Sequence, residues 1–112
     1  MSDRLLFALG AVDAPSTHPE PGLERQVLVH TPELMLVRHR MQKGWRGTRH
    51  AHPHHQLVYI VSGGIRAVVR DTEIGARAGD SFIVEPNAEH QAWALEDSVV
   101  LDVFTPARED YL

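Results

Sequence analysis

Half of the eight histidines of this chain lie within six consecutive residues: His50, His52, His54 and His55. Neutral imidazole is the commonest protein ligand for transition metals, so the cluster predicts a metal site. If residues 50–52 are extended, side chains alternate between two faces, and His50 and His52 point the same way. Gln56 shares their parity and can face them if the next strand folds back beside them. A fourth ligand must then come from elsewhere in the chain.

Length and composition restrict the class of protein. The 112 residues suffice for one domain with a modest core, and a hydrophobic content of 43% is ordinary for a globular chain. A net charge of −4 without a long run of Lys and Arg argues against nucleic-acid binding. Zero cysteines exclude disulfides, thiolate zinc sites and cysteine nucleophiles. The apolar run at 5–12 is too short to span a membrane, so we expect a cytoplasmic protein with no membrane partner.

Short strands dominate the chain from residue 25 onward, because runs of branched apolar residues alternate with turn signals. The runs are 26–30, 33–41, 56–62, 65–70, 73–78, 81–84, 89–95 and 98–105. Residues 5–9 could add a short edge strand or a turn of helix. We therefore predict an all-β fold of about eight to nine antiparallel strands, closed into a barrel or jelly roll that leaves few edges exposed.

The predicted divisions are an N-terminal arm or edge segment at 1–24, the barrel at 25–105 and a C-terminal tail at 106–112. Prolines and glycines in the first division exclude a long helix, so most of it is expected to be a loop or arm.

The histidine region resembles the first sequence motif of the cupins. Gly44 is followed after five residues by His50-x-His52. Gln56 comes three residues later and Gly63 after a further six, which is the cupin spacing with Gln where many members have Glu.

The second cupin motif is matched in part, since Gly79-Asp80 opens it and His90 closes it. Three positions depart from it: Glu85 replaces proline, Asn87 replaces glycine and Ala94 replaces asparagine. Asn tolerates a positive φ better than most residues, so the turn is retained. The resemblance implies a single-domain, RmlC-like jelly-roll barrel with a metal inside, and it implies His90 as the fourth ligand.

A narrower resemblance is to the KdgF-type cupins of pectin and alginate breakdown. It rests on residues 34–37, on His50-Ala-His-Pro-His54 with Gln56, and above all on the C-terminal run. That run, Leu101-Asp-Val-Phe-Thr-Pro-Ala-Arg-Glu-Asp-Tyr-Leu112, is similar to the D-V-F-x-P-x-R-x-D-[YF]-L tail of those proteins. His55 departs from the pattern, because that family has Glu there. The resemblance implies conversion of 4,5-unsaturated uronate monosaccharides into linear keto-deoxy uronates.

Carried over position by position, the resemblance implies a set of metal ligands and a set of groups around the substrate. The ligands are His50, His52, Gln56 and His90, for one divalent transition metal: Ni, Zn, Mn, Fe or Co. The catalytic or substrate-contacting residues are Asp102, Phe104 and Arg108. The implied partner is a small anionic sugar, and other cupins suggest a homodimer built from N-terminal strands.

Residue chemistry supports the same reading. Three neutral imidazoles and a neutral amide leave a divalent ion its full charge, which favours an anionic oxygen substrate over oxygen activation. Asp102 shares parity with Val100 and Phe104 in an apolar strand, where a carboxylate is costly unless it faces a solvated cavity or a partner. Asp102 is thus an acid/base candidate, which could relay a proton as a hemiacetal opens before the enol ketonises at C4. Arg108 could hold a uronate carboxylate through two hydrogen bonds.

Each assignment has an ordinary structural alternative. The three ligand histidines could be polar loop residues of a metal-free cupin, and Gln56 could merely hydrogen-bond within the site. Asp102 could lock its strand to an arginine such as Arg66, and Arg108 could pair on the surface with Glu109 or Asp110. At the level of function, a small iron dioxygenase and a non-catalytic cupin that binds a sugar or metabolite stay open.

The other histidines and the tryptophans receive simpler predictions. His54 and His55 are expected at the rim of the site or behind its ligands. His18, His30 and His39 are expected on the surface or in strands, and Trp45 and Trp93 in the core or an interface.

Overall fold

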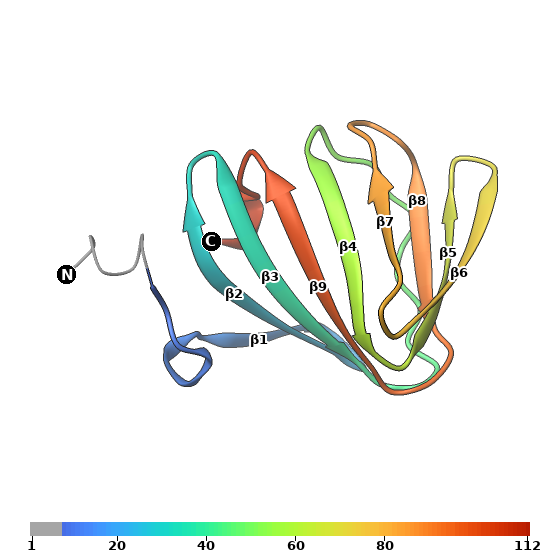
Figure 1. Ribbon diagram of the computed structural model, residues 1–112, viewed down its shortest axis with the longest axis horizontal. Coiled ribbons are helices and arrows are strands. Elements are labelled where there is room, and N and C mark those ends of the chain that lie inside the picture. Colours follow the sequence, from blue (N-terminus) through green and yellow to red (C-terminus); the bar gives the residue numbers. More distant parts are fainter. Residues whose placement is uncertain (1–7) are drawn as a thin grey trace.

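Nine strands of the described chain form two antiparallel sheets that face each other (Figure 1). The structure is a computed structural model and describes residues 8–112. The strands are β1 (Ser16–Glu20), β2 (Leu23–Thr31), β3 (Leu34–Met41), β4 (His55–Ser62), β5 (Gly64–Val69), β6 (Thr72–Arg77), β7 (Ser81–Val84), β8 (His90–Ala94) and β9 (Ser98–Thr105). Two short 3₁₀ helices are η1 (Ala11–Asp13) and η2 (Glu109–Tyr111). The predicted all-β jelly roll is confirmed.

The larger sheet has the strand order β1-β2-β3-β9-β4-β7, and the smaller sheet has the order β6-β5-β8. Because β9 pairs with both β3 and β4, the end of the chain joins the N-terminal strands to the rest of the barrel. Burial alternates along β9, so that Val100, Asp102 and Phe104 are buried and the residues between them are half-exposed. This alternation turns the Asp102 side chain into the barrel, as its parity predicts.

The N-terminal part of the chain differs from the expected loop. Residues 16–20 form β1, which pairs antiparallel with β2 at the edge of the larger sheet. Pro19 is tolerated there because an edge strand has a side whose N–H groups need no partner. Of the strand or helical turn suggested at 5–9, residues 5–7 lie outside the described residues. The division into arm, barrel and tail stays a prediction.

Two clusters of apolar side chains form the core. One cluster joins both sheets and consists of Leu23, Met41, Val58, Ile60, Ile65, Ala76, Ala94 and Val100. The second lies under the C-terminal tail and consists of Met35, Val37, Phe104 and Ala107. Full burial of a Val, Leu, Ile, Phe or Met side chain contributes about 1.5–3 kcal/mol to the stability of the fold.

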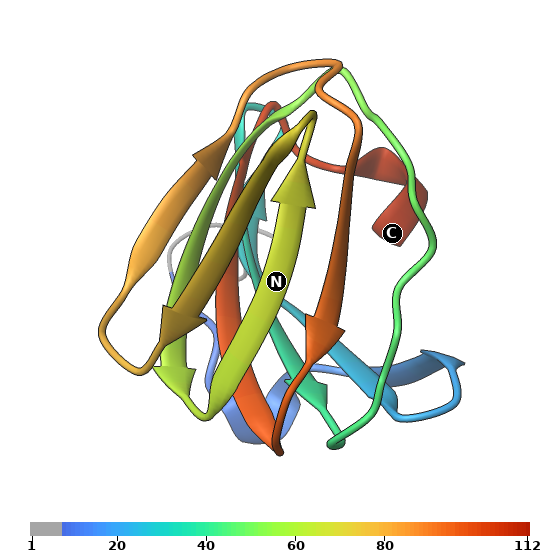
Figure 2. The same ribbon diagram turned by 90° about the vertical axis from the view of Figure 1, so that its right-hand side faces the viewer.

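The chain between β3 and β4 runs alongside β8 (Figure 2). The N–H groups of Gly44 and Gly47 donate to the carbonyls of Ala94 and Ala92, both at 2.9 Å. Further along, His50 and His90 exchange two backbone hydrogen bonds, of 3.0 and 2.8 Å. The segment therefore acts as an additional edge of the smaller sheet, and it places the first histidine motif beside the second.

The C-terminal tail folds back against the end of the larger sheet near β2 and β3 (Figure 1). The N–H of Ala107 donates to the carbonyl of Pro32 at 3.1 Å. The guanidinium carbon of Arg25, in β2, lies 3.7 Å from the centroid of the Tyr111 ring. These contacts fix the tail where its side chains can reach the barrel interior.

The outward face of β4 and β7 carries exposed apolar side chains. Leu57, Tyr59, Val61 and Ile83 are exposed by 40–55%. The homodimer expected from other cupins stays a prediction.

Within residues 8–112, no helix has the length and hydropathy needed to cross a membrane.

We predict that Gly63→Ala destabilises the protein far more than Gly79→Ala does. Both glycines have a positive φ, +84° and +91°, which costs an alanine about 1–2 kcal/mol. At Gly79 a Cβ would meet nothing within 4 Å, whereas at Gly63 it would lie 2.3 Å from the Asp97 carbonyl oxygen. The free energy of unfolding in urea should fall by more than about 3 kcal/mol for Gly63→Ala. Equal losses in the two variants would contradict the close approach at Gly63.

Candidate metal centre

Three imidazoles converge beside the barrel cavity. His50 and His52 come from the segment before β4, and His90 is the first residue of β8. Their potential ligand atoms all lie within 4.8 Å of one another. The ring centroids are 4.3 Å apart for His50 and His90, and 4.9 Å apart for His52 and His90. The two distant motifs singled out in the sequence therefore meet in space.

Backbone contacts hold the two motifs together. Besides the paired bonds between His50 and His90, the N–H of Asn87 donates to the carbonyl of His52 at 2.8 Å. Asn87 has a φ of 65°, the positive value that the motif predicts at this position. The turn before β8 is therefore bonded directly to the segment that carries His52.

Hydrogen bonds to carbonyls set the tautomers of two of the rings. The Nδ1 atoms of His50 and His90 lie 2.8 Å from the carbonyl oxygens of Thr48 and Ala88. Because a carbonyl only accepts, each ring donates from Nδ1 and keeps a lone pair on Nε2. This is the arrangement in which backbone carbonyls orient the histidine ligands of a metal.

Gln56 completes the set of donor atoms. Its Oε1 lies 2.9 Å from Nε2 of His52, and its Nε2 donates to Oδ1 of Asp102 at 2.8 Å. A separation near 3 Å suits two neighbouring ligands that each lie about 2.0–2.2 Å from one ion. Three imidazoles and one amide oxygen thus fit a divalent transition metal.

Two of the imidazoles have lowered pKa values. Burial, followed by the nearby Arg108 guanidinium, lowers the pKa of His52 to about 4, although its hydrogen bond to Gln56 acts in the opposite direction. Burial also lowers the pKa of His90. Both rings are therefore neutral at pH 7. In the metal-free chain His52 Nε2–H donates to Gln56 Oε1, so that proton must move to Nδ1 before Nε2 can bind a metal.

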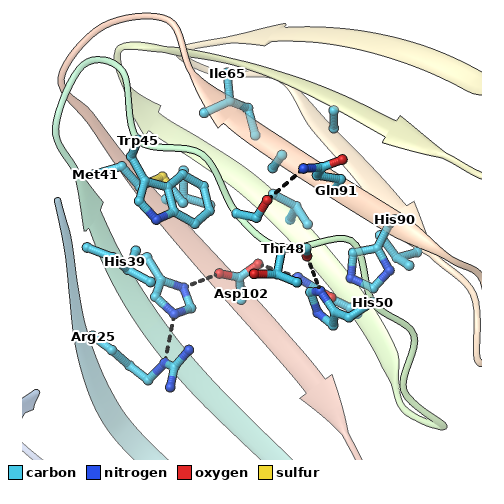
Figure 3. Close-up of a pocket in the computed structure, with 18 of the residues that line it drawn as sticks. Arg25, His39, Met41, Trp45, Thr48, His50, Ile65, His90, Gln91 and Asp102 are labelled. Carbon is cyan, nitrogen blue, oxygen red and sulfur yellow. Dashed lines mark hydrogen bonds and ion pairs between the residues drawn. The ribbon is translucent and has the colours of Figure 1, made fainter. Parts of the chain in front are cut away.

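Asp102 sits inside the barrel between two hydrogen-bonding partners (Figure 3). Its Oδ2 lies 2.7 Å from Nδ1 of His39, and its Oδ1 accepts from Gln56. Arg66, the alternative partner considered from the sequence, instead donates to Glu73 at 2.8 Å. Asp102 therefore faces the cavity and is bonded to a candidate ligand.

Arg108 is buried, with 8% of its surface exposed. Its Nε and Nη2 donate to the two carboxylate oxygens of Asp110 at 3.0 and 2.8 Å. The guanidinium carbon lies 5.2 Å from the centroid of the Phe104 ring and 4.3 Å from that of Tyr111. Nη1 is buried and has no hydrogen-bond partner among the described residues. The ion pair with Asp110 thus exists, but the arginine lies inside the protein and keeps one amino group free.

A cavity of about 340 Å³ lies between the sheets, within the range of small-molecule sites. Its polar lining includes His50, Gln56, His90, Asp102 and Arg108. Its apolar lining includes Leu23, Met41, Trp45, Val58 and Ile65. Three of the four candidate ligands, the buried carboxylate and the buried guanidinium therefore line the same cavity.

The remaining histidines of the cluster lie at its margin. His54 is half-buried, and its ring centroid lies 5.4 Å from that of His52 and 6.3 Å from that of Phe104. His55 is exposed at the start of β4. Trp45 packs against the main core cluster, and Trp93 lies under the Arg66 guanidinium at 4.7 Å.

Sequence reasoning missed His39 and Arg25. His39 is in a strand, one of the two places predicted for it, but it is 7% exposed and bonds to Asp102, a role that was not predicted. The missed signal was the parity of His39 with Met35, Val37 and Met41, all of which face inward in β3. Arg25 reaches His39 from the neighbouring strand β2, with Nε 3.0 Å from the His39 Nε2.

Comparison with known families agrees with this geometry. A family model described as Cupin domain matches residues 37–104. This protein is a cupin. The match covers both histidine motifs and all of the site residues predicted from the sequence except Arg108.

Relatives of this cupin indicate its nearer group. Pectin degradation protein KdgF of Dickeya dadantii (strain 3937) is 32% identical over 93 residues, or 81% of this chain and 84% of that protein. The structure of KdgF from Halomonas sp. has a TM-score of 0.88 and 34% identity, and the match covers 94% of this cupin and 97% of that chain. An RmlC-like cupin from Shewanella frigidimarina NCIMB 400 has a TM-score of 0.90 and 35% identity, over 95% of this chain and 96% of that one. The resemblance to KdgF-type cupins is confirmed.

We predict that the metal-free cupin loses stability as the pH falls from 6.5 toward 4. The pKa of His52 is about 4 in the folded chain, and an unfolded histidine titrates near 6.5. Between these values the unfolded chain binds a proton that the folded chain does not, so acid favours unfolding. The measurement is urea unfolding in the presence of a chelator at pH 7 and pH 5.

The matched variants are His52→Asn and His18→Asn, the second at an exposed position in β1. His52→Asn should lose less stability between pH 7 and pH 5 than the wild type, whereas His18→Asn should behave like the wild type. An equal loss in all three proteins would contradict the lowered pKa of His52.

Proposed function

We propose that this cupin opens 4,5-unsaturated uronate monosaccharides to linear keto-deoxy uronates, with the help of a divalent transition metal. The observation that carries the proposal is a cavity lined by two histidines of the three-histidine cluster, a buried carboxylate and a buried guanidinium. Such a site can bind an anionic sugar and move one proton. The likeness to the pectin degradation protein KdgF supports this choice of substrate class.

Arg108 is proposed to bind the carboxylate of the uronate. The two hydrogen bonds to Asp110 hold the guanidinium plane, while Nη1 is buried beside the cavity and has no partner among residues 8–112. A buried donor of this kind is costly until an acceptor arrives, so a ligand carboxylate would satisfy it. The centroid of the Phe104 ring lies 5.2 Å from the guanidinium carbon of Arg108 and 5.8 Å from the centroid of the His52 ring. Phe104 thus keeps the arginine and the histidine in a fixed relation.

Asp102 is proposed to move the proton. It would accept the proton of the anomeric hydroxyl as the C1 carbonyl forms and the bond from C1 to the ring oxygen breaks. The ring oxygen leaves on C5 as an enolate, and a proton delivered to C4 converts it to the ketone. The net result is the transfer of one proton from oxygen to carbon, so no oxidant or reductant is consumed.

His50, His52, Gln56 and His90 are the residues that would hold the ion. When bound, a divalent ion there supplies Lewis acidity toward an anionic oxygen ligand, with its charge undiminished by the four neutral donors. Ni, Zn, Mn, Fe and Co all suit such a donor set.

The test of the activity uses a purified unsaturated galacturonate or guluronate monosaccharide. Metal-loaded cupin should remove the conjugated ultraviolet absorbance of the substrate without consuming oxygen, and a chelator should abolish the reaction until metal is restored. Oxygen uptake, measured with an electrode, would instead indicate a dioxygenase. Binding of the uronate without turnover would indicate a non-catalytic cupin.

We predict that Asp102→Asn lowers kcat for this reaction by about 100-fold or more, the usual contribution of a positioned base. Asp71→Asn is the matched control, because Asp71 is an exposed carboxylate in the turn between β5 and β6. Metal content is measured for both variants, since Asp102 contacts Gln56. Undiminished turnover by Asp102→Asn would remove Asp102 from the reaction.

A further inference from the structure

Four consecutive side-chain hydrogen bonds link Arg25, at one side of the cavity, to His52 in the histidine cluster. Arg25 Nε donates to His39 Nε2 at 3.0 Å, and His39 Nδ1 lies 2.7 Å from Asp102 Oδ2. Gln56 then joins Asp102 Oδ1 at 2.8 Å to His52 Nε2 at 2.9 Å. Figure 3 shows the first part of this chain, in which Arg25 and Asp102 lie on opposite sides of the His39 ring.

The direction of the hydrogen bonds at the Arg25 end of this series follows from the chemistry of the groups. A guanidinium group can only donate, so Nε2 of His39 must accept from Arg25. A neutral ring that accepts at Nε2 carries its proton on Nδ1, and this N–H must donate to Asp102 Oδ2. Arg25 therefore selects the tautomer of His39 that can serve Asp102.

The direction at the other end also follows. A carboxylate only accepts, so Gln56 must present its amide NH₂ to Asp102 Oδ1. The amide oxygen of Gln56 is then turned toward His52. If the amide were reversed, its NH₂ would face the histidines and its oxygen would face a carboxylate. Gln56 would then offer no ligand atom to a metal and no donor to Asp102 Oδ1.

Burial gives these directions energetic weight. His39 and Asp102 are 7% and 3% exposed, so water cannot easily replace a lost donor at the carboxylate. Arg25 is held by the Tyr111 ring at 3.7 Å, and it takes part in none of the ion pairs found within residues 8–112. Its Nε is therefore committed to His39 rather than to a carboxylate.

We propose that Arg25 and His39 are positioning residues. They fix the orientation of Asp102 through its Oδ2 and, through Asp102, keep the amide oxygen of Gln56 directed at the histidine cluster. The proposal rests on the metal site of the proposed function and is independent of its substrate. Neither residue is a candidate ligand. Their contribution to metal affinity should resemble that of other groups that orient ligands, where a loss costs about 10–100-fold.

The first experiment reads the tautomer of His39 in the metal-free wild-type protein. Long-range ¹H–¹⁵N correlation spectra distinguish a ring protonated on Nδ1 from one protonated on Nε2. We expect the Nδ1–H form for His39. The Nε2–H form would overturn the proposal, because His39 could then not donate to Asp102.

The second experiment measures the affinity of variants for Co²⁺ and Zn²⁺, by visible absorption and by competition with a chelator. His39→Leu removes the donor to Asp102 and should weaken binding about 10-fold or more. His39→Asn offers an amide N–H near the place of Nδ1–H and should restore most of the affinity. Arg25→Met should weaken binding as well, whereas the control Arg38→Met should not. Arg38, the neighbour of His39 in β3, bonds to Gln26 on the opposite face of the strand.

Urea unfolding of the same variants separates positioning from simple destabilisation. Equal metal affinities of His39→Leu and wild type, or equal losses in His39→Leu and His39→Asn, would overturn the proposal. If the metal affinities of the variants follow the expected pattern but the wild type converts no uronate, the positioning role stands and the proposed function fails. If the wild type turns over uronate and the variants keep both metal affinity and kcat, the function stands and the positioning role fails.

Discussion

The site depends on the pairing of two backbone segments that are far apart in the sequence. His50 and His90 exchange N–H to carbonyl hydrogen bonds, and Asn87 adds a third bond to the carbonyl of His52. Without this pairing, the imidazoles would belong to two separate segments and would not converge on one position. Since strand pairing fixes both the distance and the facing of neighbouring residues, the histidines need little side-chain adjustment to converge. The closed sheet thus supplies the preorganisation that a metal centre requires.

A second level of order is polar and lies deeper in the barrel. Buried polar groups need partners. Here the buried His39 and Asp102 bond to each other and to the half-buried Arg25 and Gln56. Each member constrains the next because its role as donor or acceptor is fixed. A chain of this kind favours a single arrangement of the site over several alternatives of similar energy. The tail residue Arg108 takes no part in this series of hydrogen bonds, and its Nη1 has no partner in the part of the protein that the structure describes.

Much of the fold and part of the site could be predicted from the sequence, for reasons that are local. Short apolar runs between turn signals indicated β2 to β9, and the resemblance to the two cupin motifs grouped His50 and His52 with His90. What could not be predicted depends on tertiary packing. Strand β1 carries a proline and little apolar surface, and only its edge position beside β2 allows it. Arg25 lies 77 residues from Asp102 in the sequence, and only the antiparallel order β2-β3-β9 brings the two to opposite sides of His39.

The candidate ligands belong to both layers of the barrel. Gln56 comes from β4 in the larger sheet, and His90 comes from β8 in the smaller one. Any ion that occupied this position would cross-link the two layers from within, in a chain without disulfides. Its binding free energy would then be added to the resistance of the whole barrel against opening, so occupancy and global cohesion would rise together. Loss of the ion in a metal-poor cell would loosen the contact between the layers as well as remove the chemistry.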